Sequence, residues 1–337
     1  MSAQPRIKRA AVAALFCCVA ASAARAEVSE LKIVRQFGIS FLPLLIMQDR
    51  GLFEKHAKAM GLDTKPIYMQ ISGGTSVNDA LLAGSIDIAS GGIPPAAIIW
   101  ARTRGTANEV KAITAKNCAP ILLLTRNPNI KSIADFTEKD KIAMPATKVS
   151  GSAIVLQMAT QKLFGKGQEF KFDSLQVAMP TPDATIALTA GSSEITSHFS
   201  EPPFQYQALK KAGIRQILKS YDVLGGKTTY NLVWTTTRFH DQNPKVYQAF
   251  LAGFRDAIAE IYRDRPAAAQ TYVRLTKEKI SAEEVLDLIN DPDIEFTMTP
   301  KNMMKIVGFM ADVGHIKVKP ASWKDLFFPE VHDLPGS

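Results

Sequence analysis

Cysteine is scarce in this chain, with three among 337 residues, and two of the three stand side by side at positions 17 and 18. Cys118 is the only cysteine in the remainder of the sequence, which excludes an intramolecular disulfide and a cysteine-based zinc site there. The five histidines show no pair at the spacing of a helical metal site. We therefore expect no metal or other cofactor, and we expect Cys118 to pack as a small apolar side chain rather than act as a nucleophile.

Signatures of common enzymes and of nucleic-acid-binding proteins are missing as well. The chain has neither a G-x-S-x-G nucleophile elbow nor a phosphate-binding Walker loop. The formal net charge is +8, but four of the basic residues lie before residue 26, and no block of lysine and arginine follows. Such a mild balance does not indicate nucleic-acid binding, although it is compatible with an anionic ligand. The sequence favours a protein that is not an enzyme.

The N-terminus has the layout of a secretory signal peptide. Basic residues at positions 6, 8 and 9 precede an apolar run at 10–20 that is too short to span a bilayer, and an A-x-A sequence follows at 24–26. Residues 1–26 are therefore predicted to be a signal peptide that is cleaved before Glu27, which makes the mature protein an exported one. No later segment is long and apolar enough to cross a membrane.

The rest of the chain is organised around residues 72–100, whose pattern predicts a loop, a helix, a short strand, a second loop and a second helix. Gly73 and Gly74 lie in the first loop, which a ligand can approach closely because glycine has no Cβ atom. Ser76 is expected to cap the first helix, and Pro94-Pro95 to open the second one.

This design recurs once. Residues 187–197 align with residues 80–90 at a constant offset of 107, and seven of the eleven positions are identical. A single pair of copies is too few for a solenoid, which needs several stacked repeats. The pair favours two similar α/β lobes over two unrelated strand–helix units that share turn chemistry.

Strands and helices alternate up to about residue 237, after which only helices are predicted, and this order is typical of α/β lobes followed by a C-terminal helical segment. Predicted strands near 121–125 and 230–237 bracket the second copy of the repeat. The economical arrangement is a discontinuous first lobe (27–119 plus 236–337) and an inserted second lobe (120–235), with two strands crossing between them as a hinge. Ligands of open α/β sheets bind in such clefts, at the carboxyl ends of strands.

Five motifs follow one another along the mature chain: Phe37 to Pro43, Gly51 to His56, the Ala-Leu-x-Ala-Gly-Ser-x-Asp-Ile element at 80–88, Lys131 to Phe136 with 141–143, and Glu201-Pro202-Pro203-Phe204. This ordered set resembles the periplasmic substrate-binding proteins of the nitrate, sulfonate and taurine type, a group that includes binders of thiamine-pyrimidine precursors. The departure from the family pattern is Ser193-Glu194, where an apolar residue and Asp are usual.

The resemblance implies the two-lobed type II periplasmic binding protein fold and a periplasmic, monomeric protein that delivers a small, anionic organic solute to an ABC permease and its ATPase. The resemblance leaves the identity of the ligand open among a sulfonate, nitrate, an aromatic carboxylate and a pyrimidine. Two other roles stay open as well: a solute receptor for a membrane sensor, and an enzyme of pyrimidine-precursor synthesis. The related fungal enzyme uses a cysteine-rich motif that this chain lacks.

Three glycine- or serine-rich loops are the main candidates for ligand contact. Ser150, Gly151 and Ser152 precede a predicted helix, whose free N–H groups suit a carboxylate, sulfonate or phosphate, although Ser150 could serve only as a cap. Gly73-Gly74-Thr75 could bind an anion in the same way in the other lobe. Gly38-Ile39-Ser40-Phe41 follows the first strand, where the resemblance places part of the pocket; Phe41 could equally be a core aromatic.

Single residues near the repeat and the hinge complete the candidates. His198 could donate to an anionic group or titrate near neutral pH, or it could be a hydrogen-bonded structural residue. Glu201 suits a ligand amine or a role in the hinge, and Trp234 suits stacking on a planar ligand or, more readily, packing in the hinge strand. The full candidate set is Gly38, Ile39, Ser40, Phe41, Gly73, Gly74, Thr75, Gly92, Asn117, Ser150, Gly151, Ser152, His198, Phe199, Glu201 and Trp234.

Overall fold

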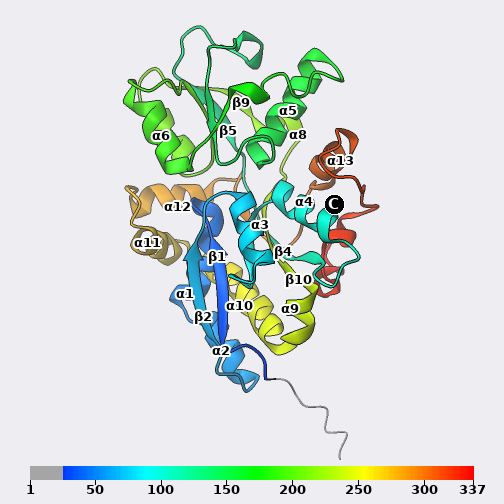
Figure 1. Ribbon diagram of the computed structural model, residues 1–337. Coiled ribbons are helices and arrows are strands. Elements are labelled where there is room, and N and C mark those ends of the chain that lie inside the picture. Colours follow the sequence, from blue (N-terminus) through cyan, green and yellow to red (C-terminus); the bar gives the residue numbers. More distant parts are fainter. Residues whose placement is uncertain (1–25) are drawn as a thin grey trace, which may run out of the picture.

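The computed structural model describes residues 26–337, which form two α/β lobes, one above the other in Figure 1. The predicted signal peptide therefore lies outside the described residues, apart from Ala26. None of the helices in the described part of the chain has the length and hydropathy required to cross a bilayer.

The first lobe is built on two sheet segments that run into each other. Strands β1 and β2 pair in parallel, and a bridge between Ile33 and Ile88 joins them to the start of β3. From there the order is β3, β10, β4 and β11, with β10 antiparallel to both of its neighbours. The strand bounds are β1 Glu30–Arg35, β2 Lys65–Gln70, β3 Ala89–Gly92, β4 Val110–Cys118, β10 Thr229–Thr236 and β11 Glu295–Phe296.

The second lobe contains a five-stranded sheet in the order β7, β6, β8, β5 and β9. Strand β6 is parallel to β7 and β8, and β5 is antiparallel to β8 and β9. The bounds are β5 Leu122–Thr125, β6 Ile142–Met144, β7 Gln176–Ala178, β8 Ser197–Ser200 and β9 Arg215–Lys219.

The sequence repeat corresponds to a structural repeat. Helix α3 (Gly74–Leu82) leads into β3 in the first lobe, and helix α6 (Thr181–Ala190) leads into β8 in the second. In the first lobe, β3 has β10 as its antiparallel neighbour and β1 as its parallel neighbour. In the second lobe, β8 has β5 as its antiparallel neighbour and β6 as its parallel neighbour. The shared turn chemistry therefore reflects two lobes of similar design.

The chain crosses between the sheets twice, from β4 to β5 and from helix α8 (Ser220–Leu224) to β10. The predicted boundary between residues 119 and 120 falls at the first crossing. Because β10 pairs with β3 and β4, however, a division that keeps both sheets whole places the second crossing before Thr229, ahead of the predicted boundary at 235/236. The strand at 230–237 was correctly located, but its partners cannot be read from its own residues.

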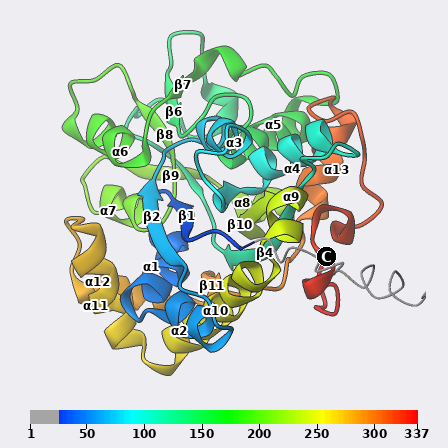
Figure 2. The same ribbon diagram turned by 60° about the horizontal axis from the view of Figure 1, so that its bottom comes forward.

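Helices cover both sheets, and the C-terminal group lies on the first lobe, as Figure 2 shows from below. One helix start differs from expectation: α3 begins at Gly74 rather than after Ser76. The other bounds are α1 Leu42–Asp49, α2 Leu52–Ala59, α4 Ile93–Thr103, α5 Gly151–Phe164, α7 Phe204–Leu209, α9 Thr237–Gln242, α10 Pro244–Arg263, α11 Arg265–Thr276, α12 Ala282–Asn290 and α13 Met304–Asp312.

Helix α10 shows how the sequence pattern produces this packing. Val246, Phe250, Phe254 and Ala257 recur at helical spacing and are fully buried against the first lobe. Gly253 lets α10 approach α2 closely, since a Cβ atom there would meet the backbone of Leu52 at 3.1 Å. The first lobe therefore provides a fixed wall for the cleft.

Candidate functional site

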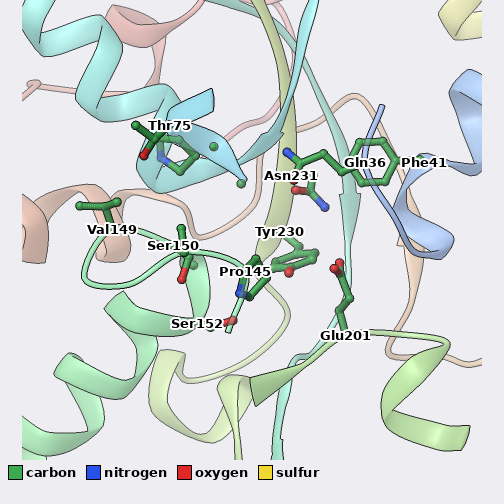
Figure 3. A pocket seen from close by; sticks show the side chains of 15 residues that line it. Gln36, Phe41, Thr75, Pro145, Val149, Ser150, Ser152, Glu201, Tyr230 and Asn231 are labelled. Carbon is green, nitrogen blue, oxygen red and sulfur yellow. The ribbon is translucent and has the colours of Figure 1, made fainter. Parts of the chain in front are cut away.

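A cavity lies between the lobes, and its empty space together with the solvent at its mouth amounts to about 540 Å³. Both lobes contribute to its wall, so the cavity exists only while the lobes face each other (Figure 3). It is lined by Gln36, Phe41, Gly74, Thr75, Gly92, Pro95, Pro145, Ala146, Val149, Ser150, Gly151, Ser152, Glu201, Tyr230 and Asn231.

The first-lobe wall includes the N-terminus of α3. Gly73 takes a positive φ of 86° and donates its N–H to the Gln36 side chain at 3.2 Å, which fixes the loop that starts the helix. The N–H groups of Gly74 and Thr75 have no hydrogen-bond partner among residues 26–337. They are free to bind an acceptor in the cavity, and the helix dipole favours a negatively charged one.

The second-lobe wall presents the N-terminus of α5 in the same way. The Ser150 hydroxyl accepts the N–H of Ala153 at 3.2 Å, so this serine does cap the helix while it also lines the cavity. The N–H groups of Gly151 and Ser152 have no partner within the described chain. Two helix N-termini, one from each lobe, thus offer unpaired donors to one cavity.

Glu201 is the only charged residue in the cavity lining. Its carboxylate accepts a hydrogen bond from the Thr181 hydroxyl at 3.1 Å, and the Tyr230 hydroxyl also donates to it. Burial raises the pKa of Glu201 to about 7, although these hydrogen bonds lower it in part. Near neutral pH the group therefore exists both as a carboxylate and as a neutral acid, and it can accept from a ligand N–H group.

A lysine that does not line the cavity lies behind its aromatic wall. The Lys116 ammonium is fully buried, 3.1 Å from the centre of the Phe41 ring, and donates to the Ser90 hydroxyl at 2.8 Å. Burial lowers the pKa of Lys116 well below its usual range. The lysine holds the ring against the cavity by a cation–π contact, so Phe41 is both a lining residue and a core aromatic.

Besides Tyr230, two polar lining residues, Gln36 and Asn231, are absent from the predicted set. Gln36 donates to the Ser90 carbonyl at 3.0 Å, and the side-chain N–H₂ group of Asn231 is buried without a partner among the described residues. Asn231 thereby adds a donor to the cavity. Both residues lie at the cleft end of a correctly predicted strand, and that position is the signal that could have identified them.

Residues 24–276 match the NMT1-like family, which is more than half of the sequence. The chain belongs to the NMT1-like family. The resemblance indicated by the ordered motifs is thereby confirmed, whereas a sequence search among curated proteins found no match.

Solved structures of similar architecture support the fold. The alkanesulfonate-binding protein SsuA from Xanthomonas axonopodis pv. citri, bound to MOPS, has a TM-score of 0.66 at 17% identity, over 89% of this chain and 95% of that one. The periplasmic nitrate-binding protein NrtA from Synechocystis PCC 6803 has a TM-score of 0.68 at 17% identity, over 89% and 84%.

A third structure, the Candida albicans CA3427 gene product, exhibits the generic periplasmic binding protein fold. It has a TM-score of 0.67 at 16% identity, over 89% of this chain and 96% of that one. At such identities the likenesses show the fold alone. This NMT1-like protein has the periplasmic binding protein fold, as the sequence predicted.

Half of the predicted site residues of this NMT1-like protein line the cavity, and the others do not. Phe41, Gly74, Thr75 and Gly92 line it from the first lobe, and Ser150, Gly151, Ser152 and Glu201 line it from the second. Gly38, Ile39, Ser40, Gly73, Asn117, His198, Phe199 and Trp234 lie outside the lining. The residues outside the lining include buried core side chains such as Ile39, Phe199 and Trp234.

His198 is one of the residues outside the lining. It is fully buried, its Nδ1 atom is 3.1 Å from the Ala143 carbonyl oxygen, and burial lowers its pKa to about 4. Of the two alternatives raised by the sequence, this environment favours a hydrogen-bonded structural residue over a group that titrates near neutral pH. Phe199 and Trp234 are buried as core aromatics, and Asn117 donates to the Ser40 hydroxyl at 2.9 Å behind Phe41.

Cys118 is buried at the end of β4, close to Glu295. Burial raises the pKa of its thiol to about 11, so the reactive thiolate is scarce at neutral pH. This environment agrees with a packing role for the side chain.

Proposed function

We propose that this protein is the periplasmic solute-binding component of an ABC importer and that it captures a small organic anion, sulfonate-like or carboxylate, in the cavity between its lobes. The observation that carries the proposal is the convergence of the α3 and α5 N-termini, with four unpaired backbone N–H groups, on one cavity. Such donors bind an anionic head group without a cationic side chain.

The chemistry of the lining supports a binding role rather than catalysis. Among the described residues, no histidine, cysteine or lysine lines the cavity, which leaves the Glu201 carboxylate as the one charged side chain there. Donors cluster near the helix N-termini, and the acceptor Glu201 stands apart from them. A ligand that combines an anionic head with an N–H group elsewhere satisfies both regions.

The fold supplies the mechanism of capture. A ligand that contacts both lobes binds the closed arrangement more tightly than the open one and therefore shifts the population toward closure. The permease then distinguishes the closed, loaded protein from the open one. The family membership and the names of the structural neighbours support this role and cellular location.

The test is a thermal-shift screen of the chain from Glu27 onward against alkanesulfonates, aromatic carboxylates, nitrate and pyrimidines, followed by calorimetry. A ligand that binds the native state at a hundred times its Kd adds about 2.7 kcal/mol of stability, which raises the melting temperature clearly. Binding of an organic anion, with uptake lost when the gene is deleted, supports the proposal. Selective binding of cations, or no ligand by screening and by native mass spectrometry, contradicts it.

A further inference from the structure

Large apolar side chains are exposed together at one end of α5. Leu163, Phe164 and Phe170 have exposed fractions of 52%, 37% and 43%, and they are three of the six large hydrophobic residues that are exposed in the described chain. All three fall within residues 162–171, the α5 tip. Exposed apolar side chains that gather in this way mark interaction surfaces more often than scattered ones do.

The charge displayed by the α5 tip is basic. Lys162, Lys166 and Lys171 are exposed among the apolar side chains, and the Lys171 ammonium lies 5.3 Å from the centre of the Phe164 ring. The one acidic residue, Glu169, is 8% exposed and accepts the N–H of Gly167 at 2.7 Å. Its carboxylate is therefore held by a backbone N–H group, and its charge offsets only part of the positive charge through the nearby Lys166.

The backbone at the α5 tip is also open to solvent. Gly165 and Gly167 take positive φ angles of 95° and 91°, and a Cβ atom added to either would meet nothing within 4 Å. Helix α5 begins at the cleft and ends at this tip, so at 1.5 Å per residue about 20 Å separates the tip from the cavity. A partner bound at the tip leaves the cleft open to its ligand.

We propose that the α5 tip is a docking surface for an anionic lipid bilayer. Apolar side chains that enter the boundary between head groups and acyl chains, with lysines reaching the phosphates, form the standard interfacial arrangement. A protein partner fits less well, because a stable interface buries about 800 Å² on each side, more than three partly exposed side chains provide. Contact with the bilayer would confine the protein to the membrane that holds its permease.

The experiment measures sedimentation of the chain from Glu27 onward with vesicles of phosphatidylcholine, alone or mixed with phosphatidylglycerol. We expect binding to the mixed vesicles only, and binding that weakens as salt is raised, because exposed charges are screened. Each lysine near an anionic surface contributes about fivefold to partitioning, so replacing Lys162, Lys166 and Lys171 by Gln should reduce it at least tenfold.

A second variant removes the apolar side chains through Leu163→Ser and Phe170→Ser; Phe164 is kept because its ring packs on Phe172. Its matched control is Ile186→Ser on α6 of the same lobe, where the side chain is 65% exposed. We expect the double variant to lose binding and the control to keep it. Because the Phe170 ring packs edge-on against His315, the melting temperature of the double variant is measured to verify that it is folded at the temperature of the assay. The proposal is overturned if the wild-type protein does not bind vesicles that contain phosphatidylglycerol, or if the control variant loses as much vesicle binding as the double variant. Either result would favour a protein as the partner of this surface. Neither result depends on the cleft ligand.

Discussion

The backbone N–H of Ile39 donates to the carbonyl oxygen of Pro202 at 3.0 Å, and this hydrogen bond joins the loop after β1 in the first lobe to the second lobe. Gly38, directly before it, has a φ of 96°. A Cβ atom on Gly38 would lie 3.0 Å from the same carbonyl oxygen and 3.3 Å from the Glu201 carboxyl carbon. Close contact between the lobes therefore depends on the absence of a side chain at this position.

We predict that Gly38→Ala weakens closure and lowers ligand affinity by about tenfold. The new methyl group separates Ile39 from Pro202 and presses on Glu201, so the closed state loses a hydrogen bond and gains strain of about 1–3 kcal/mol. Calorimetric titration with the solute found by screening, together with small-angle scattering, measures both effects.

The control is Gly165→Ala, because Gly165 has nearly the same backbone angles, φ 95° and ψ 168°, but open space around its Cβ position. It reproduces the backbone strain without the contact between lobes. The interpretation is wrong if both variants lose the same affinity.

The buried carboxyl group of Glu201 makes stability depend on pH. Its pKa is about 7 in the folded protein and lower in the unfolded chain, so the folded state holds the proton more tightly and stability falls as pH rises toward 7. Glu201→Gln removes this titration. We expect the stability of the variant relative to wild type to increase by about 2 kcal/mol between about pH 5 and about pH 8, measured by urea unfolding.

Glu283→Gln, at an exposed position of α12, serves as the matched control and should leave the pH profile unchanged. A Glu201→Gln profile parallel to that of the wild type would show that the carboxyl group is not buried in solution.

Ser152 provides a test of charge at the α5 N-terminus. This residue is 2% exposed and lines the cavity beside unpaired N–H groups. Ser152→Asp should abolish binding of an anionic ligand, since its carboxylate would occupy or repel the place of the ligand head group. Ser152→Asn, which has nearly the same shape without the charge, should lose much less. Unchanged affinity in a folded Ser152→Asp protein would contradict an anion at this helix.

His240 couples the C-terminal segment to α9 through charge. Its ring contacts Asp241 at 2.7 Å and Glu330 at 2.8 Å, and although burial lowers its pKa, these two carboxylates outweigh that effect and raise it. The resulting stability is present at low pH and is lost as pH rises through the folded pKa. Since the ring is partly exposed, we expect His240→Asn to cost under about 1 kcal/mol near pH 6 and less near pH 9, by urea unfolding.

His332→Asn tests whether the effect needs carboxylates, because the His332 ring donates to the Lys324 carbonyl oxygen instead. If the stability of the two variants depended on pH in the same way, the explanation based on the carboxylate partners of His240 would be contradicted.

Much of the fold followed from periodicity and from turn residues. The offset of 107 identified α3 with β3 and α6 with β8 as equivalent units, and Pro94-Pro95 marked the start of α4. These signals are local. The pairing of β10 depends on residues more than a hundred positions away, which explains why its lobe was assigned wrongly.

The candidate site shows the same limit. The loops at 73–75 and 150–152 could be found because small residues before a helix leave N–H groups free. Which side chain of a strand faces the cleft depends on register, so His198 and Trp234 were chosen although they face the core, while Tyr230 and Asn231 were missed. No local sequence pattern could identify Lys116, because its role depends on contact with Phe41, which lies far away along the chain.

The position of β10 also bears on the order in which the lobes can be completed during synthesis. Among residues 26–337, strand β4 has its ladder partners in β10 and β11, both of which follow the whole second lobe in the chain. A chain that emerges from its N-terminus therefore has all five strands of the second sheet available before the first sheet receives its central strand. The first lobe therefore begins the sequence, but its sheet can be completed only after all strands of the second sheet have been made.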